Sequence, residues 1–159
     1  MNKALPLFVY GTLLDVDILS AVLGRALLPN ALQPANLPGY STLTYPGESF
    51  PVLCECSYSS AAGALLHGLS EEDWQRIDFY EGDEYGFVEI KTQTAAGEVL
   101  ALINHQADSQ LDARTPWTIQ GWVSEAKPAF LPLCQRYMAL FGSMSIAEAD
   151  VYWQQWQAQ

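Results

Sequence analysis

The sequence contains few basic residues. Only 7 of its 159 residues are Lys or Arg, against 18 Asp and Glu, and its formal net charge is −11. An acidic surface of this kind repels phosphate backbones and anionic lipids, so neither nucleic acid nor a membrane is an expected partner. The charge does not identify a small-molecule ligand, because a local site can differ from the average field.

Cysteine and histidine are also scarce, and their spacing matches neither a disulfide framework nor a zinc site. Cys54 and Cys56 lie two residues apart, as small apolar core residues on one face of a strand would. His67 and His105 do not form a ligand-spaced pair with them, so no metal is expected. A Cys–His nucleophile pair is possible, but no local feature marks any of these residues as activated.

Several recognisable segments are missing. No apolar run is long enough to span a membrane. Residues 1–14 superficially resemble a signal peptide, but two aspartates follow at once and no convincing cleavage site is present. The chain also lacks a Gly-x-Ser-x-Gly elbow, a P-loop lysine and dinucleotide-binding glycines. We therefore expect a soluble cytoplasmic protein that uses none of these common sites.

The composition is that of a folded protein, since 50% of the residues are hydrophobic and 16% are charged. The length favours one domain over residues 1–159, without an internal repeat or a linker. Strand patterns dominate the first two thirds and helical patterns the last third, which predicts an α+β fold. Residues 124–159 are expected to form a helical C-terminal extension.

Local signals divide the first half of the chain. Residues 5–10 predict a buried strand that ends at Gly11, and Asp15 or Asp17 can cap a helix that stops at Gly24. The stretch 27–51 is rich in Pro, Gly and Tyr, which predicts short irregular strands and long loops.

The second half carries clearer caps. A strand is predicted at 63–69, followed by a helix from Ser70 to about Tyr80 and a hairpin that turns near Gly97. Ser145 begins a capping box for a closing helix, and Pro132 is expected to limit the helix before it.

An acidic stretch, IDFYEGDEY, follows the predicted central helix, and its carboxylates are Asp78, Glu81, Asp83 and Glu84. An ordinary solvated turn would explain this composition. Against that reading, Glu81 stands among Phe79, Tyr80 and Tyr85, which can desolvate it, and its neighbouring carboxylates oppose its ionisation. Both effects raise a carboxyl pKa toward the range useful for proton transfer at neutral pH.

The order FVYGTL, LPGY, YPG, FPVL, GALLHGL and IDFYEGDEY resembles the γ-glutamylcyclotransferase-like family, in particular its γ-glutamylamine cyclotransferase and avirulence-induced plant protein branch. The resemblance covers about residues 6–105. It implies a small mixed β-barrel with flanking helices, in which the YGTL loop faces one glutamate across a cavity. In this sequence that glutamate is Glu81.

The resemblance also implies a reaction, of transferase or lyase type. The α-amine of a γ-glutamyl substrate attacks its own γ-carbonyl and releases 5-oxoproline with an amine or amino acid. The nucleophile belongs to the substrate, so the enzyme mainly provides ring-closing geometry. Glu81 is the implied general acid and base, and neither a metal nor a cofactor is needed.

Substrate contacts are implied for the loop Tyr10, Gly11, Thr12 and Leu13, where a small residue and successive amides suit a carboxylate. Tyr85 is expected either to wall the pocket or to be purely structural, and Asp78 to support the turn. A non-catalytic binding or interaction protein on the same fold is the alternative function. The leaving group and the oligomeric state remain open.

Overall fold

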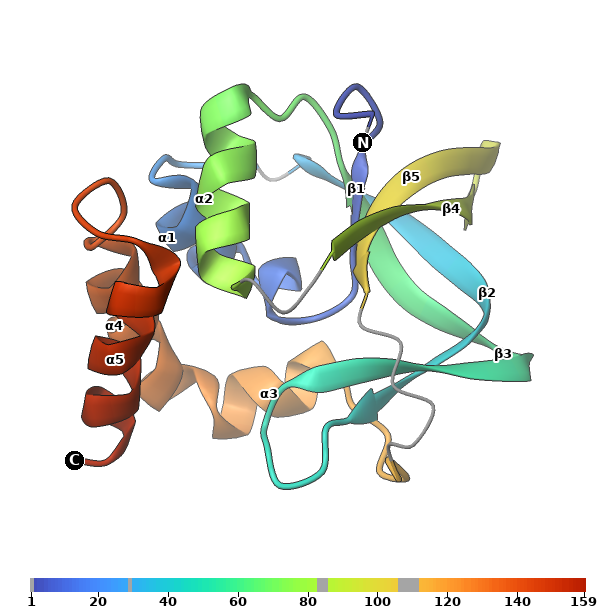
Figure 1. The fold of residues 1–159 in the computed structure, drawn as a ribbon. Helices are drawn as coiled ribbons and strands as arrows, with labels where there is room; N and C mark the ends of the chain where they lie inside the picture. Colours follow the sequence, from blue (N-terminus) through green and yellow to red (C-terminus); the bar gives the residue numbers. More distant parts are fainter. Residues whose placement is uncertain (1, 29, 83–85, 106–111) are drawn as a thin grey trace.

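The fold is a small closed barrel with helices packed beside it (Figure 1). The computed structural model describes residues 2–28, 30–82, 86–105 and 112–159. Within these ranges the strand order around the barrel is β1-β3-β2-β4-β5. The strands are β1 (Leu7–Val9), β2 (Leu32–Thr44), β3 (Pro51–Leu66), β4 (Gly86–Thr94) and β5 (Gly97–His105). β1 runs parallel to β5 and the other neighbours are antiparallel, so the predicted α+β fold with a mixed barrel is confirmed.

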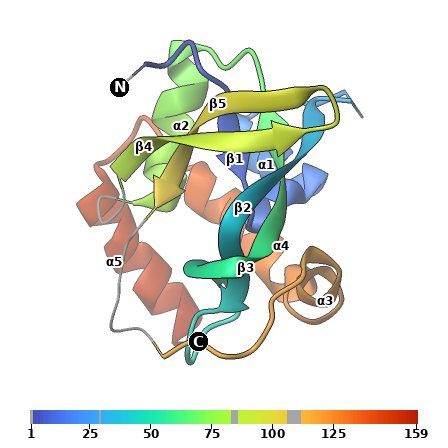
Figure 2. The same cartoon turned by 90° about the vertical axis from the view of Figure 1, so that its right-hand side faces the viewer.

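Helices α1, α2, α4 and α5 gather on one side of the barrel (Figures 1 and 2). The helical segments are η1 (Thr12–Leu14), α1 (Val16–Leu23), α2 (Glu71–Glu81), α3 (Ile119–Glu125), α4 (Lys127–Met138) and α5 (Ile146–Gln157). In the described part of the chain, none of these helices is long and apolar enough to cross a membrane.

The predicted helix boundaries follow local hydrogen bonds. The Asp15 side chain accepts from the amides of the first turn of α1, and Gly24 ends that helix with a φ of 69°. Ser70 and Asp73 form the reciprocal capping box of α2. Ser145 caps α5 by accepting from the Glu148 amide. Each capping side chain bonds to an amide two or three residues later in the chain, so the caps could be predicted from the local sequence.

The prediction of short irregular strands and long loops over 27–51 was wrong for residues 32–44, which form the single 13-residue strand β2. Its prolines, Pro34 and Pro38, are four residues apart, so their missing N–H groups fall on the same edge of the strand. Pairing with β3 continues on both sides of them, with a register shift between Pro38 and Tyr40. The predicted strand at 63–69 is the end of β3, which begins much earlier, at Pro51.

The sequence predicted that Pro132 limits the penultimate helix. Pro132 instead lies inside α4, which continues past it. A proline there removes one backbone hydrogen bond. Buried Cys134, Tyr137 and Met138 follow it, and their tertiary packing outweighs the local preference.

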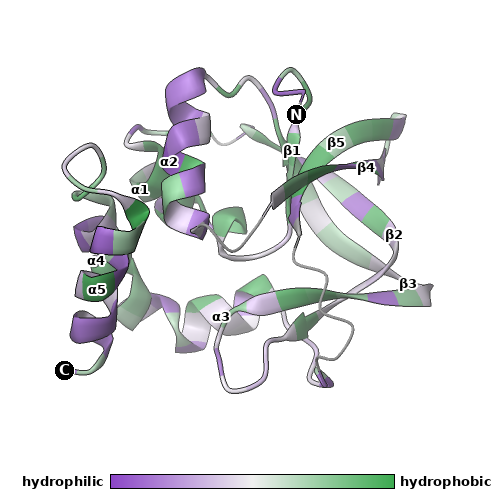
Figure 3. Cartoon of the chain, in the orientation of Figure 1, coloured by the Kyte–Doolittle hydropathy of each residue, from purple (hydrophilic) through white to green (hydrophobic). Residues whose placement is uncertain are grey.

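The main apolar core joins the barrel to all the large helices. Residues of β1, α1, α2, α4 and α5 belong to one buried cluster, in which Cys134, Tyr137, Met138 and Ala149 represent the C-terminal helices. In Figure 3, β5 is largely hydrophobic, whereas the side of α2 turned to the viewer is hydrophilic. Cys54 and Cys56 are half-buried, so the prediction that they are core residues was wrong.

Candidate active site

A cavity of about 610 Å³ lies between the barrel, the C-terminal end of α2 and the helices α4 and α5. Five of the six predicted site residues line it, namely Tyr10, Gly11, Thr12, Leu13 and Glu81. Tyr85, the sixth, lies outside the described residues. The structure therefore brings the loop after β1 and the last residue of α2 to one cavity, although some seventy residues separate them.

The loop after β1 presents backbone groups to the cavity. Leu14 is the first residue of the short η1 turn whose amide donates to a carbonyl of the same turn, that of Gly11, at 3.0 Å. A helix start leaves the amides before that point without an intrahelical acceptor. A Cβ on Gly11 would meet the Pro51 side chain at 3.0 Å, so glycine permits this close approach. The Leu13 side chain is buried in the core, so Leu13 can offer a ligand only its backbone.

Glu81 is the acid of the site. It ends α2, and the Gly82 that follows adopts φ 85° and ψ 173°, a conformation that is essentially restricted to glycine. Burial raises the pKa of Glu81 from 4.5 to about 7, and a hydrogen bond from the Asn104 side chain partly offsets this rise. The predicted direction of the shift is confirmed. Phe79 does not line the cavity itself but is buried behind it, where its ring packs against Tyr137.

Asn104, near the end of β5, is a site residue that the sequence reading missed. It is 8% exposed, its backbone carbonyl accepts from the Tyr10 hydroxyl at 3.0 Å, and its side-chain amide meets Glu81. Its Oδ1 is buried without a hydrogen-bond partner and belongs to a residue that lines the cavity. A buried acceptor without a partner calls for an explanation, and a ligand donor that reaches it on binding would supply one. The signal in the sequence was a polar residue inside the apolar run ALIN.

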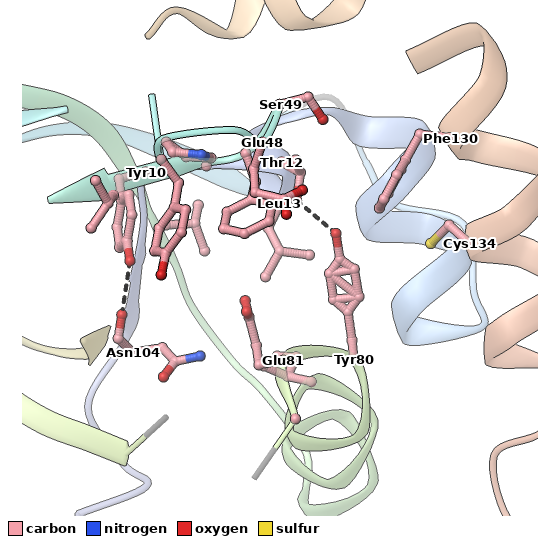
Figure 4. Close-up of a pocket in the computed structure, with 18 of the residues that line it drawn as sticks. Tyr10, Thr12, Leu13, Glu48, Ser49, Tyr80, Glu81, Asn104, Phe130 and Cys134 are labelled. Carbon is pink, nitrogen blue, oxygen red and sulfur yellow. Dashed lines mark hydrogen bonds between the residues drawn. The ribbon is translucent and has the colours of Figure 1, made fainter. Parts of the chain in front are cut away.

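Tyr80 forms the other wall beside Glu81. Its hydroxyl lies 2.6 Å from the Thr12 hydroxyl, which ties α2 to the loop after β1. Burial raises the pKa of Tyr80 well above its usual value, so the phenol stays protonated at neutral pH. Figure 4 shows Glu81 between Tyr80 and Asn104, with Thr12 and Leu13 across from it, and with Phe130 and Cys134 beyond Tyr80.

The helices α4 and α5 line the side of the cavity that lies beyond Tyr80 as seen from Glu81. Phe130 and Tyr137 of α4 contact Trp153 of α5 edge-on, with ring centroids 5.7 and 5.6 Å apart. The Tyr137 hydroxyl donates to the Phe79 carbonyl at 3.0 Å and lies 3.5 Å from the Asp150 carboxylate. The sequence reading did not assign these residues to the site, because no short motif links them to Glu81. Among the described residues, no group of His, Cys, Asp and Glu is arranged to hold a metal ion.

Fold and site together define a closed-barrel protein in which a half-buried acid, Glu81, faces a backbone loop across a cavity. Residues 7–124 match the family described as gamma-glutamyl cyclotransferase, AIG2-like, and the chain belongs to that family. It is 31% identical over 86 residues to AIG2-like protein B of Arabidopsis thaliana, a match that covers 53% of this chain and about half, 48%, of that relative. It is 25% identical over 137 residues to AIG2-like protein A of the same plant, covering 82% and 79% of the two chains.

Solved structures agree on the fold. A solution structure of an Arabidopsis thaliana protein aligns with a TM-score of 0.60 at 20% identity, covering 90% of this chain and 86% of that one. A structure described as gamma-glutamyl cyclotransferase aligns with a TM-score of 0.56 at 16% identity, covering 95% and 98%. At these identities the likeness establishes the fold only, and the activity of this chain has to be argued from its own site.

Proposed function

We propose that the protein is a γ-glutamyl cyclotransferase that converts a γ-glutamyl amide into 5-oxoproline and a free amine or amino acid, with Glu81 as general acid and base. The observation that carries this proposal is the position of Glu81, whose pKa of about 7 and shared cavity with the 10–13 loop suit proton transfer to a bound substrate. Family membership supports the same class of reaction.

The loop of residues 10–13 and Asn104 bind different parts of the glutamyl group. The substrate α-carboxylate accepts hydrogen bonds from the amides of Thr12 and Leu13, which have no acceptor inside the η1 turn. The α-amine, attached to the same carbon, donates to the unpaired Oδ1 of Asn104. Because the Asn104 side chain also hydrogen-bonds to Glu81, this arrangement brings the substrate α-amine close to Glu81, the residue that must deprotonate it.

The chemistry is a ring closure within the substrate. The α-nitrogen forms a bond to the carbonyl carbon of the γ-amide, the bond from that carbon to the leaving nitrogen breaks, and no water is consumed. Glu81 takes one proton from the α-ammonium group and returns it to the leaving nitrogen. The second proton, which the α-nitrogen loses as the lactam forms, follows the same route, so the amine departs as an ammonium ion and Glu81 is left ionised. The enzyme supplies proximity and one proton carrier, and the substrate supplies the nucleophile.

The test is 5-oxoproline release from a panel of γ-glutamyl amides by the wild type and by Glu81→Gln. The amide keeps the size of the side chain but cannot carry the proton, so we expect kcat to fall by about 10²- to 10⁴-fold while substrate binding remains. Glu72→Gln is the matched control, since Glu72 is an exposed residue at the opposite end of α2 and does not line the cavity.

Two results would contradict the proposal. Equal turnover by the wild type and Glu81→Gln would remove Glu81 from the mechanism. Binding of γ-glutamyl compounds without release of 5-oxoproline from any of them would favour the alternative, a non-catalytic binding or interaction protein on this fold.

A further inference from the structure

The proposed ring closure places negative charge on an oxygen for which the cavity provides no cation. When the α-nitrogen bonds to the carbonyl carbon of the γ-amide, the π electrons of that carbonyl move onto its oxygen, and they return when the bond to the leaving nitrogen breaks. Enzymes stabilise such an oxygen with fixed hydrogen-bond donors. None of the described residues that line the cavity is Lys, Arg or His, so the donor has to be a neutral N–H or O–H group.

The hydroxyl groups near the acid differ in what they already bond to. The Tyr10 hydroxyl donates to the Asn104 carbonyl and the Tyr137 hydroxyl donates to the Phe79 carbonyl, each at 3.0 Å. In the described part of the chain, the Thr12 hydroxyl makes no such bond to a carbonyl, and its partner is a second hydroxyl. The Thr12 hydroxyl is therefore better placed to donate to a substrate than the other two.

That second hydroxyl belongs to Tyr80, which is positioned to donate to Thr12. The two oxygens are 2.6 Å apart, and a phenol is a stronger hydrogen-bond donor than an aliphatic alcohol. Burial raises the pKa of Tyr80 well above its usual value, so the phenol keeps its proton at neutral pH. When Thr12 Oγ1 accepts this bond, its own hydrogen is left for another acceptor. Figure 4 shows Thr12 across the cavity from Glu81, where the reacting amide has to lie.

We propose that the Thr12 hydroxyl donates to the γ-carbonyl oxygen of the substrate as that oxygen becomes negative, and that Tyr80 is the positioning residue that orients and polarises Thr12. This inference rests on the proposed cyclotransferase activity and adds to it a donor for the carbonyl oxygen. The proton stays on Thr12 throughout, so Thr12 takes no part in the proton transfers of Glu81. Successive hydrogen bonds strengthen one another, so the phenol makes Thr12 a better donor.

The arrangement also explains why two neighbouring residues of α2 contact different walls of the barrel. Tyr80 bonds to the loop after β1, and Glu81 bonds to Asn104 of β5. Because the two residues are consecutive at the end of one helix, the donor for the oxygen and the base for the nitrogens are held at a fixed separation. Such fixed placement of donor and base is what transition-state stabilisation requires.

The experiment measures 5-oxoproline release from γ-glutamyl-n-butylamide by the wild type, Tyr80→Phe, Thr12→Val and the double variant. A hydrogen bond that strengthens as charge develops acts in the transition state, so kcat is expected to fall while KM changes little. We expect kcat to fall by about 10²-fold in Thr12→Val and by about tenfold in Tyr80→Phe. The double variant is expected to match Thr12→Val, because Tyr80 acts through Thr12.

Two further variants separate positioning from simple support of the helix. Tyr137→Phe also removes a hydroxyl that holds the end of α2, through the Phe79 carbonyl, but this hydroxyl does not bond to Thr12. It is expected to lower Tm about as much as Tyr80→Phe does, with a much smaller loss of kcat. Thr12→Ser keeps a hydroxyl and is expected to recover most of the kcat that Thr12→Val loses.

Three results would overturn the assignment. They are additive losses of kcat in the double variant, a loss in Tyr137→Phe as large as that in Tyr80→Phe, and a raised KM with unchanged kcat in Thr12→Val. All three require turnover by the wild type, so they leave Glu81 in place as acid and base. If the wild type releases no 5-oxoproline from this amide or from any other γ-glutamyl amide of the panel, the proposed function fails and this inference fails with it.

Discussion

At the scale of single residues, the site depends on one carboxyl group held in two competing environments. Burial disfavours the charged form of Glu81 and raises its pKa to about 7, whereas the Asn104 amide favours the charged form and limits the rise. The two residues come from α2 and β5, so the acidity of the base depends on how the helix sits on the barrel. A glutamate with its usual pKa would be fully ionised at neutral pH but a weaker proton acceptor.

This balance predicts the pH dependence of the reaction. The base must be ionised to accept a proton from the α-amine, so kcat/KM is expected to rise with pH along a limb centred at about 7. Asn104→Leu removes the donor that stabilises the carboxylate, so its limb is expected at higher pH. The measurement is a pH profile of 5-oxoproline release by both proteins. A wild-type limb near 4.5, or a limb that Asn104→Leu moves downward, would contradict this assignment.

At the scale of elements, the end of α2 positions the base. The residue after Glu81 leaves the helix with φ 85° and ψ 173°, which turns the chain away while the Glu81 side chain stays in the cavity. The Tyr80–Thr12 hydrogen bond fixes the same turn of the helix to the loop after β1. The geometry of the site is therefore set by a helix terminus and one side-chain contact.

Gly82→Ala tests this element. A Cβ at Gly82 meets no atom within 4 Å, so the cost arises from the backbone conformation and not from a clash. We expect a loss of about 1–3 kcal/mol in the free energy of unfolding, measured by chemical denaturation, together with lower kcat as the helix end shifts. Gly86→Ala is the control, since Gly86 also has open space but no positive φ, and is expected to change stability much less. Equal losses in both variants would show that the Gly82 conformation is not the cause.

The elements also show how far sequence reasoning reached. The caps at Asp15, Ser70 and Ser145 were predictable, because a few neighbouring residues decide them. The long β2 strand and the continuous α4 were not, because pairing with β3 and burial in the core outweigh the local effect of their prolines. In the site, Glu81 and the YGTL loop were found by family resemblance. Asn104 and Asp150 were missed, because only the tertiary fold brings them to the cavity.

At the scale of the whole molecule, the barrel and the C-terminal helices share one core and one cavity. The family match ends at residue 124, yet Tyr137, Met138 and Ala149 are buried in the same cluster as β1 and α2. The side chain of Lys127 also bonds to Asp15 at 2.8 Å and to Asp17 at 2.7 Å, which joins the start of α4 to the start of α1.

A protein that ends at residue 126 is therefore expected to lose cooperative unfolding and 5-oxoproline release together. The deletion exposes the apolar surface of α1 and α2 that α4 covers and opens one side of the cavity. Calorimetry of the truncated protein measures the cooperativity of unfolding, and an assay of 5-oxoproline release measures its activity. A truncated protein that unfolds cooperatively and keeps its activity would show that residues 127–159 are a dispensable extension.

The position of β1 has a consequence for how the protein is made. The strand is synthesised before the rest of the barrel, but its parallel partner is β5, so that Leu7 and Phe8 pair with Leu102 and Ile103. A nascent chain cannot close the barrel before β5 has left the ribosome, and pairing over such a separation is slow to form. The loop that follows β1 must therefore wait for its structural support while the other strands are synthesised. The parts of the site made first are completed only when α5 has been synthesised.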